Sequence, residues 1–167
     1  MQTLVGRCAL VLGDDVNTDV IYPGKYLKIS DPIEMARHAL EGVQEGLWEQ
    51  MRPGDILVAG RNFGCGSSRT QSVACLRALQ VQAVIAASFA RSFFRNSINQ
   101  GLPALVCPAA GRIAAGERLG IDFATHLIQA EGGQYPFEPY PPLLMNILEA
   151  GGLTNLGKDI VQGKLRL

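Results

Sequence analysis

The chain has 167 residues, of which 47% are hydrophobic and 18% charged, and its 15 basic and 15 acidic side chains give a formal net charge of zero. This composition is typical of one folded domain, which we expect to span residues 1–167, and it excludes an intrinsically disordered chain. Because no basic stripe or polybasic patch is present, we expect neither nucleic acid nor a membrane surface as a partner.

The first apolar run, residues 4–12, contains Arg7 and is far too short to cross a bilayer. We interpret it as the first strand of a cytoplasmic protein. Residues 13–23 are polar and contain Asp14, Asp15 and Asp19 close together. This composition predicts a loop whose side chains solvate their own backbone, since a calcium loop would need more oxygen ligands at alternate positions and a following Glu.

A strong helix start follows at Asp31. Aspartate is a preferred N-cap residue, Pro32 suits the first helical position, and Glu34 lies three residues after the cap. Apolar residues continue at helical spacing to Leu47, so the pattern predicts a helix over residues 32–47, weakened by glycines in its later turns. We interpret His38, within this helix, as a surface or packing residue.

A glycine-rich turn, residues 60–69, follows a short apolar strand at residues 56–59 and precedes a helix that we expect to reach about Gln80. Glycines allow the backbone to approach a ligand, and the amino end of a helix favours anions. Ser67 and Ser68 add hydroxyls, and Arg69 offers a planar group that can hold a carboxylate through two hydrogen bonds. A carboxylate or a phosphate is the expected ligand.

Other glycine-loop chemistries do not fit this turn. It lacks the Gly-Lys-Ser/Thr of a P-loop, the third glycine of a dinucleotide fingerprint, and the Gly-x-Ser-x-Gly of a hydrolase elbow. The simpler alternative is that the glycines and serines only cap a helix, with Ser67 or Ser68 as the N-cap residue. Spacing alone leaves the anion site and the capping turn about equally supported.

The second half of the chain predicts an alternation of strands and helices. A near-continuous apolar run at residues 81–87 is typical of a strand buried on both faces, and strand, helix and strand together imply a right-handed parallel crossover. A helix ending at Gly101 and a buried strand at residues 104–107 follow. From Arg118 onward apolar residues alternate with other residues, a pattern that predicts antiparallel hairpins. Residues 143–150 predict a last helix, which two glycines end.

The cysteines and histidines do not form a recognisable metal motif. No Cys-x-x-Cys pair is present, and the two histidines, His38 and His126, lie far apart in the sequence. We therefore expect no metal site made by this chain alone. Three cysteines lie in apolar runs and are expected to be buried free thiols, with Cys65 in the glycine-rich turn as the exception.

Several separated segments match one family. They are Asn17-Thr18-Asp19, Tyr26-Leu27-Lys28, residues 60–69, residues 84–90, residues 96–103, residues 135–137 and residues 147–152. Over nearly its whole length the chain resembles the small subunits of 3-isopropylmalate dehydratase, which correspond to the swivelling domain of aconitase-type hydro-lyases. The resemblance implies an α/β fold, a swivelling β/β/α domain with a mostly parallel central sheet flanked by helices plus an antiparallel β-hairpin region.

The resemblance also implies a function. It indicates an enzyme of leucine biosynthesis that isomerises 2-isopropylmalate and 3-isopropylmalate by dehydration and rehydration. In such enzymes a separate large subunit carries a [4Fe–4S] cluster on three cysteines, so we expect no cofactor bound by this chain and a heterodimer or heterotetramer as the active form. The small subunit would supply the other half of the site for a dicarboxylate substrate.

Site residues carry over by position. Ser67 matches the serine that, as an alkoxide, takes the proton next to the carboxylate, and Arg69 matches a ligand of the substrate carboxylate. Ser68 and Gly66 match neighbouring substrate-binding positions. Asp19 matches an acidic residue of the site that orients or balances charge.

The loop that sets substrate choice in this family contains Lys28 and Ile29 here. An isopropyl group requires an apolar pocket and an additional carboxylate requires a cation, so this pair leaves the substrate open. The chain also has Thr70-Gln71 where family members usually have Glu-His, and Gln71 cannot relay a proton at neutral pH.

Three alternatives stay open. One is the same chemistry on homoaconitate, 2,3-dimethylmalate or methylaconitate. The second is a non-catalytic regulatory or RNA-binding relative of aconitase, for which the zero net charge offers little support. The third is a stand-alone anion-binding module that would need no partner for full affinity.

Overall fold

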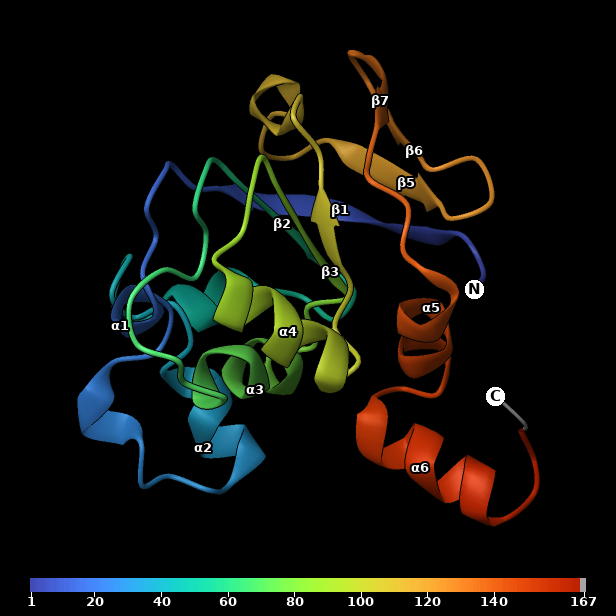
Figure 1. Ribbon diagram of the computed structural model, residues 1–167. Coiled ribbons are helices and arrows are strands. Elements are labelled where there is room, and N and C mark those ends of the chain that lie inside the picture. The colour runs from blue at the N-terminus through green and yellow to red at the C-terminus, as the bar shows by residue number, and fades with distance from the viewer. Residues whose placement is uncertain (166–167) are drawn as a thin grey trace.

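The computed structural model describes residues 1–165 and is built on one curled sheet of seven strands in the order β4-β3-β2-β1-β5-β6-β7 (Figure 1). Strands β1 to β4 run parallel to one another, whereas β5, β6 and β7 continue the sheet beyond β1 as an antiparallel meander. The strands are β1 Leu4–Val11, β2 Ile56–Ala59, β3 Ala83–Ala86, β4 Ala104–Val106, β5 Arg118–Asp122, β6 Leu127–Ala130 and β7 Gly133–Pro136. The expected α/β class and hairpin region are confirmed.

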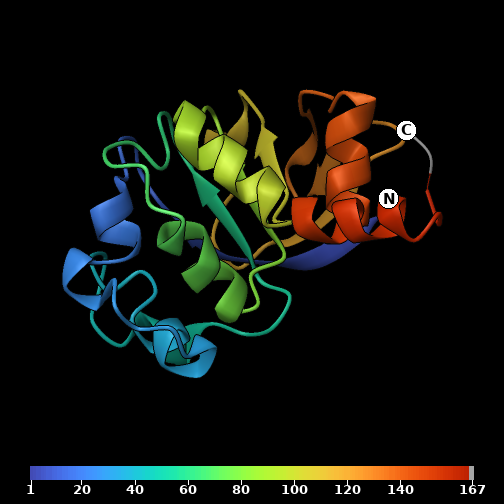
Figure 2. The ribbon, with the colours of Figure 1, turned by 60° about the horizontal axis from the view of Figure 1, so that its bottom comes forward.

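Helices cover one face of the parallel strands (Figures 1 and 2). They are α1 Thr18–Ile21, α2 Pro32–Arg37, α3 Gln71–Ala78, α4 Arg91–Asn99, α5 Pro142–Glu149 and α6 Leu153–Val161. Short 3-10 turns occur at Gly24–Tyr26, Leu47–Gln50 and Ala110–Arg112. In Figure 2, helices α3 and α4 lie in front of the parallel strands, and α5 and α6 pack beside α4.

The parallel strands are buried on both faces, as the near-continuous apolar run at residues 81–87 predicts. Leu57 and Val84 face a core that includes Leu76 from α3 and Phe93 from α4. The alternate residues of these strands face a second core on the other side of the sheet. Because the sheet curls, side chains of β5 and β6 cover this second core. The second core includes Ile56, Val58, Ala83, Ile85, Leu119, Ile121 and Ile128.

Helix α2 begins as predicted but ends much earlier. Asp31 caps it by accepting a hydrogen bond from the Glu34 backbone N–H at 3.0 Å. The predicted continuation to Leu47 is wrong, because Leu40 takes a left-handed conformation with φ 61°. Its N–H bonds to the carbonyl of Ile21 at 2.7 Å, so packing against α1 replaces the next helical turn.

Two helices were not predicted from the sequence. The polar segment after β1 contains the short helix α1, and the C-terminal part of the chain adds α6. Leu156 of helix α6 is buried in a small hydrophobic cluster that also contains Ile98 of α4. Ile160 of α6 packs against this cluster. The last expected helix, α5, is confirmed and ends before Gly151.

Candidate active site

Two loops at the carboxyl ends of β1 and β2 meet side by side. Residues 13–20 and 60–69 are joined by backbone hydrogen bonds, among them Asp15 N–H to the Arg61 carbonyl and Gly64 N–H to the Val16 carbonyl, both at 2.8 Å. Thr18 N–H adds a bond to the Cys65 carbonyl at 2.9 Å. Ligands of open α/β sheets usually bind at the carboxyl ends of the parallel strands, so these two loops form the candidate site.

Asp14 and Asp15 hold the glycine-rich turn. Asp14 Oδ1 accepts a hydrogen bond from the Arg61 backbone N–H at 2.7 Å. Asp15 Oδ1 accepts one from the side-chain Nδ2 of Asn62 at 2.9 Å. The prediction that these carboxylates solvate their own loop is therefore wrong, because their partners lie 47 residues further along the chain. A Cβ at Gly60 would lie 2.0 Å from Asp14 Oδ1, which explains the glycine there.

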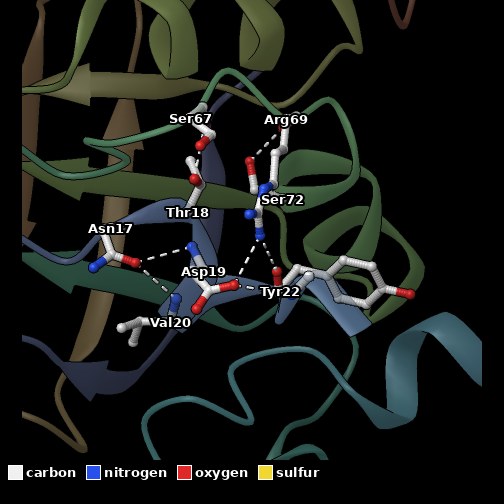
Figure 3. Close-up of polar contacts among 9 residues, drawn as sticks. Asn17, Thr18, Asp19, Val20, Tyr22, Ser67, Arg69 and Ser72 are labelled. Atoms are coloured by element: carbon white, nitrogen blue, oxygen red, sulfur yellow. Dashed lines mark hydrogen bonds and ion pairs between the residues drawn. The ribbon is translucent and has the colours of Figure 1, made fainter. Parts of the chain in front are cut away.

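Asn17 and Thr18 fix the geometry on the other side (Figure 3). Asn17 Oδ1 accepts from Asp19 N–H at 2.9 Å and from Val20 N–H at 3.0 Å, so it caps α1. Thr18 is buried, and its hydroxyl donates to the Ser67 carbonyl at 2.8 Å. These bonds fix Ser67 through its backbone and leave its hydroxyl to face outward.

Asp19 and Arg69 form the charged centre of the site (Figure 3). Arg69 Nη1 donates to Asp19 Oδ1 at 2.8 Å, and Gly24 N–H donates to the same oxygen at 2.9 Å. The hydrogen bond from Arg69, followed by that from Gly24, lowers the pKa of Asp19 below its ordinary value. Asp19 is therefore a carboxylate at neutral pH, and its hydrogen bond holds one nitrogen of the Arg69 guanidinium.

Arg69 keeps donors for a ligand. Its Nη1 also lies 3.5 Å from the Tyr22 carbonyl, but within residues 1–165 no protein acceptor bonds to Nη2 or Nε. The side chain is 22% exposed, so it is held in place while its open edge meets solvent. A guanidinium anchored at one nitrogen can hold a carboxylate with the remaining two.

Two glycines shape the turn that presents the serines. Gly64 has φ 79°, and a Cβ there would lie 2.2 Å from the ring of Phe93, so both conformation and space require glycine. Gly66 has φ 90° but open surroundings, with no atom closer than 3.5 Å to a Cβ. Ser67 and Ser68 are exposed, and in the described part of the chain their hydroxyls have no protein partner. Both are free to meet a substrate.

The capping alternative for this turn is wrong in its simple form. Helix α3 begins at Gln71 with Thr70 as the N-cap residue, and no side chain caps it. The carbonyl of Arg69 accepts from the Ser72 hydroxyl at 2.7 Å, and the helix begins at Gln71, three residues after Ser68. Ser67 and Ser68 therefore stand in the loop before the helix.

Comparisons with known proteins show the family of the chain. The family model "Aconitase C-terminal domain" matches residues 46–110. A 3-isopropylmalate dehydratase small subunit 1 from Archaeoglobus fulgidus is 45% identical over 158 residues, 93% of this chain and 98% of that protein. The chain belongs to the 3-isopropylmalate dehydratase small-subunit family. A second relative with the same name, from Methanopyrus kandleri, is 42% identical over 95% of both chains.

A solved structure extends the likeness to the fold. The crystal structure of a 3-isopropylmalate dehydratase from Methanocaldococcus jannaschii matches with a TM-score of 0.90 and 40% identity, covering 98% of this chain and 99% of that one. The swivelling-domain fold expected from the sequence is thus confirmed. Membership of a small-subunit family implies that this chain has a large-subunit partner.

The remaining predicted site residues lie at the periphery. Lys28 is exposed, and Ile29 is half-buried with its side chain packed against the core under the helices. No described contact brings either of them to Ser67 or Arg69, so their part in substrate choice stays a prediction. Gly24 was not predicted, although it touches the charged pair. A Pro-Gly step after Tyr22 indicates only a turn, so the sequence carried no clear signal for it.

Three of the four cysteines are buried free thiols, as expected. Burial raises the pKa of Cys8 to about 11 and also raises the pKa of Cys75 and of Cys107, so these thiols are not reactive at neutral pH. Cys65 is half-buried in the turn. Residues 1–165 contain no group of three or more His, Cys, Asp or Glu side chains placed to hold a metal ion. No helix in that range is long and apolar enough to span a membrane.

Proposed function

We propose that this chain is the small subunit of a 3-isopropylmalate dehydratase and that, with its large subunit, it interconverts 2-isopropylmalate and 3-isopropylmalate in leucine biosynthesis. The observation that carries the proposal is the juxtaposition of an exposed Ser67 with Arg69 held by Asp19, in a chain 45% identical to a named small subunit over 93% of its length. We also propose that the enzyme acts in the cytoplasm.

Ser67 is the proposed base. Dehydration breaks the C–H bond next to a carboxylate and the C–O bond on the adjacent carbon; the C–H proton passes to the Ser67 alkoxide, and the departing hydroxyl takes a second proton from an acid on the large-subunit side of the site and leaves as water. Rehydration reverses these steps with the hydroxyl on the other carbon. A serine hydroxyl is a weak base, so its charged form requires nearby donors, and Arg69 and the N–H groups of the turn are suitable.

Arg69 and Asp19 share one task. The open edge of the guanidinium, Nη2 and Nε, binds a substrate carboxylate through two hydrogen bonds, while Asp19 holds Nη1 in place at 2.8 Å. Ser68 and Gly66 lie next to Ser67 in the same exposed turn. Their hydroxyl and backbone are placed to support the bound carboxylate.

The site is open on one side, which is what half of a shared site requires. Ser67 and Ser68 are exposed and the side chain of Asp19 is 65% exposed. We infer that the large subunit covers this face in a heterodimer or heterotetramer. The family resemblance assigns the [4Fe–4S] cluster to that subunit, where it would act as a Lewis acid for the departing hydroxyl; the described residues of this chain offer no ligand set for it.

The substrate is the finer part of the proposal. Thr70-Gln71 begins α3 right after Arg69, where the usual family residues would add an acid and an imidazole. Lys28 would suit a third carboxylate, as in homoaconitate, and Ile29 an alkyl group, as in isopropylmalate or 2,3-dimethylmalate. The names of the relatives favour isopropylmalate.

An acid panel tests this proposal. The chain is reconstituted anaerobically with its large subunit, and the absorbance of the unsaturated intermediate is followed with 3-isopropylmalate, homoaconitate, 2,3-dimethylmalate and methylaconitate in parallel. We expect the highest kcat/KM with 3-isopropylmalate. A higher kcat/KM with another acid would mean that the enzyme is a hydro-lyase of a different pathway. No turnover of any acid would overturn the proposal.

A further inference from the structure

The loop after β3 lies against the glycine-rich turn of the candidate site. Phe63 N–H donates to the Ser88 carbonyl at 3.1 Å, and Ala90 N–H donates to the Phe63 carbonyl at 2.9 Å. The Ser88 hydroxyl accepts a further hydrogen bond from Asn62 N–H at 2.8 Å. The start of α4 is therefore attached to the same turn that presents Ser67.

A groove extends from this loop along α4. Its first part has a volume of about 330 Å³ and includes Phe89 and Val106 in its walls. Its second part, of about 220 Å³, includes Leu144 of α5. Arg91 and Phe94 line both parts. The two parts thus form one continuous surface, which we call the α4 groove.

Aromatic rings supply the apolar surface of the α4 groove. Phe89 and Phe94 are half-buried, with ring centroids 6.1 Å apart. Phe89 stacks on buried Phe93 at 6.1 Å with 2° between the ring planes, and Phe94 lies 6.3 Å from Tyr140. Packing thus holds both rings in place while part of each stays exposed. Fixed aromatic rings of this kind often anchor protein interfaces.

Two arginines at the groove have no partner within the described chain. Arg91 and Arg95 are exposed, and in residues 1–165 neither forms an ion pair or a side-chain hydrogen bond. The described contacts do not pair Glu138, which lines the same groove, with Arg91. Like charges four residues apart on a helix are mildly destabilising, and Arg91 also lies at the positive end of the helix dipole. Carboxylates of a partner would offset both costs.

The area of a subunit interface requires more surface than the site itself provides. A stable interface buries roughly 800 Å² on each partner, or about 20–30 residues a side. Residues 19 and 66–69 supply only a small part of this, so a subunit that covers Ser67 has to extend over neighbouring residues. On the β1 side, the carboxylates of Asp14 and Asp15 are engaged by the turn. The α4 groove instead offers open aromatic and arginine side chains, which are enriched at interfaces.

We propose that the large subunit docks in the α4 groove, with an apolar side chain between Phe89 and Phe94 and carboxylates against Arg91 and Arg95. This inference rests on the shared site of the proposed function, and it goes further by naming the docking surface and the chemistry that fits it. The apolar contact supplies affinity, whereas the charges orient the partner and speed its association. The α4 groove has no role in the chemical step.

Charge reversal tests the docking surface without a threat to the fold. Glutamate is favourable in the first turn of a helix, so Arg91→Glu should fold as well as the original chain. We expect its Kd for the anaerobic large subunit to rise about tenfold or more, while kcat at saturating large subunit stays within about twofold. Arg118→Glu, at an exposed arginine of β5 outside the groove, is the matched control and should leave Kd unchanged.

Hydrogen–deuterium exchange provides a second measurement that needs no variant. The first N–H groups of a helix lack helical partners, so those at the start of α4 should exchange quickly in the free chain. They should exchange more slowly once the large subunit is bound. The N–H groups of residues 123–126, in the turn between β5 and β6, should exchange at the same rate in both states.

Each outcome of these experiments bears on the inference. Equal Kd values for Arg91→Glu and Arg118→Glu, or no protection at the start of α4, would overturn it and leave the proposed function intact. A dimer of this chain alone that Arg91→Glu dissociates in analytical ultracentrifugation would also contradict it, because the groove would then hold a second copy. An original chain that does not bind the large subunit at all would instead overturn the shared site of the proposed function, and this inference with it.

Discussion

Asp19 and Arg69 lie 50 residues apart in the sequence and are joined by a hydrogen bond of 2.8 Å between Oδ1 and Nη1. The pair connects the loop after β1 to the loop after β2, and it holds one nitrogen of the guanidinium while leaving two for a ligand. Ser67, two residues before Arg69, is fixed through its carbonyl by Thr18 at 2.8 Å. Each of these contacts has a measurable consequence.

Replacement of Ser67 by alanine should remove the base without disturbing the fold, because its hydroxyl makes no contact within the described chain and only its carbonyl is engaged. We expect kcat of the reconstituted enzyme to fall by on the order of a thousandfold, with assembly unchanged by gel filtration. Ser92→Ala, at an exposed serine of α4, is the matched control. Near-normal turnover by Ser67→Ala would remove Ser67 from the chemistry.

Arg69→Lys should lower kcat/KM by on the order of a hundredfold, because an ammonium group cannot reach Asp19 and grip a carboxylate with two parallel donors at once. Steady-state kinetics with 3-isopropylmalate measures the effect. Arg77→Lys, at an exposed arginine of α3, the helix that follows the loop of Arg69, should change nothing. Equal losses in the two variants would mean that the two-donor contact is not made.

The pKa of Asp19 is expected to lie below that of an ordinary aspartate, of about 3.9, and to rise in Arg69→Ala, since the Arg69 hydrogen bond is the largest cause of the lowering. A carboxyl group with a lowered folded-state pKa adds stability that is present above the unfolded pKa and is lost as pH falls through the folded pKa. The contribution of the pair is therefore complete at neutral pH and disappears only on strong acidification.

Carboxyl NMR titration checks this directly. Asp122 serves as the internal control, because its pKa is lowered mainly by the backbone N–H of Ala124 and by Thr125, far from the site. Its titration should be unchanged in Arg69→Ala. An Asp19 titration that does not move in that variant would show that the ion pair does not form in solution.

Gly24→Ala should raise KM several-fold without changing stability. The added methyl group would lie 3.3 Å from Arg69 Nη1, which is closer than most such contacts, so the guanidinium has to shift slightly; its distance of 3.5 Å from Asp19 Oδ1 is an ordinary contact. The backbone itself is not strained, because Gly24 has no positive φ. Gly111→Ala, which meets no atom within 4 Å, is the control. Identical kinetics in the two variants would place Gly24 away from bound substrate.

A partly buried ion pair at the start of β2 tests the fold independently of the site. Asp55 is 3% exposed and accepts hydrogen bonds from Arg7 Nη2 at 2.6 Å and from Arg52 N–H at 2.8 Å, whereas the side chain of Arg7 is 35% exposed. Asp55→Ala should lower the free energy of unfolding by about 1–2 kcal/mol, because it leaves the Arg52 backbone N–H without its acceptor while Arg7 can still be hydrated. Asp159→Ala, which breaks an exposed pair with Lys164, should cost less than about 0.5 kcal/mol in the same urea experiment.

Local signals in the sequence predicted local structure well. The cap at Asp31, the apolar run at residues 81–87 and the alternation after Arg118 each have their cause within a few residues. The helix expected beyond Arg37 failed because the Leu40 N–H finds its acceptor in Ile21, a tertiary contact that no periodicity reveals.

The same distinction holds at the site. Ser67 and Arg69 could be proposed as site residues from the sequence because a glycine-rich turn with serine and arginine favours an anion, and Asp19 was added by resemblance; their roles stay predictions. The partners of Asp14 and Asp15 lie 47 residues away, and the contact of Gly24 with the guanidinium depends on the path of a loop. Such relationships exist only in three dimensions.

The central claim is that this chain supplies half of a shared active site. The most direct measurement is to titrate it into a fixed amount of anaerobic large subunit and to follow the turnover of 3-isopropylmalate, with Ser67→Ala titrated in parallel. We predict no turnover by either subunit alone, a rate that rises and saturates as the original chain is added, and no rise with Ser67→Ala although it binds equally well. Full activity of the large subunit without this chain, or an equal rise with the variant, would contradict the account.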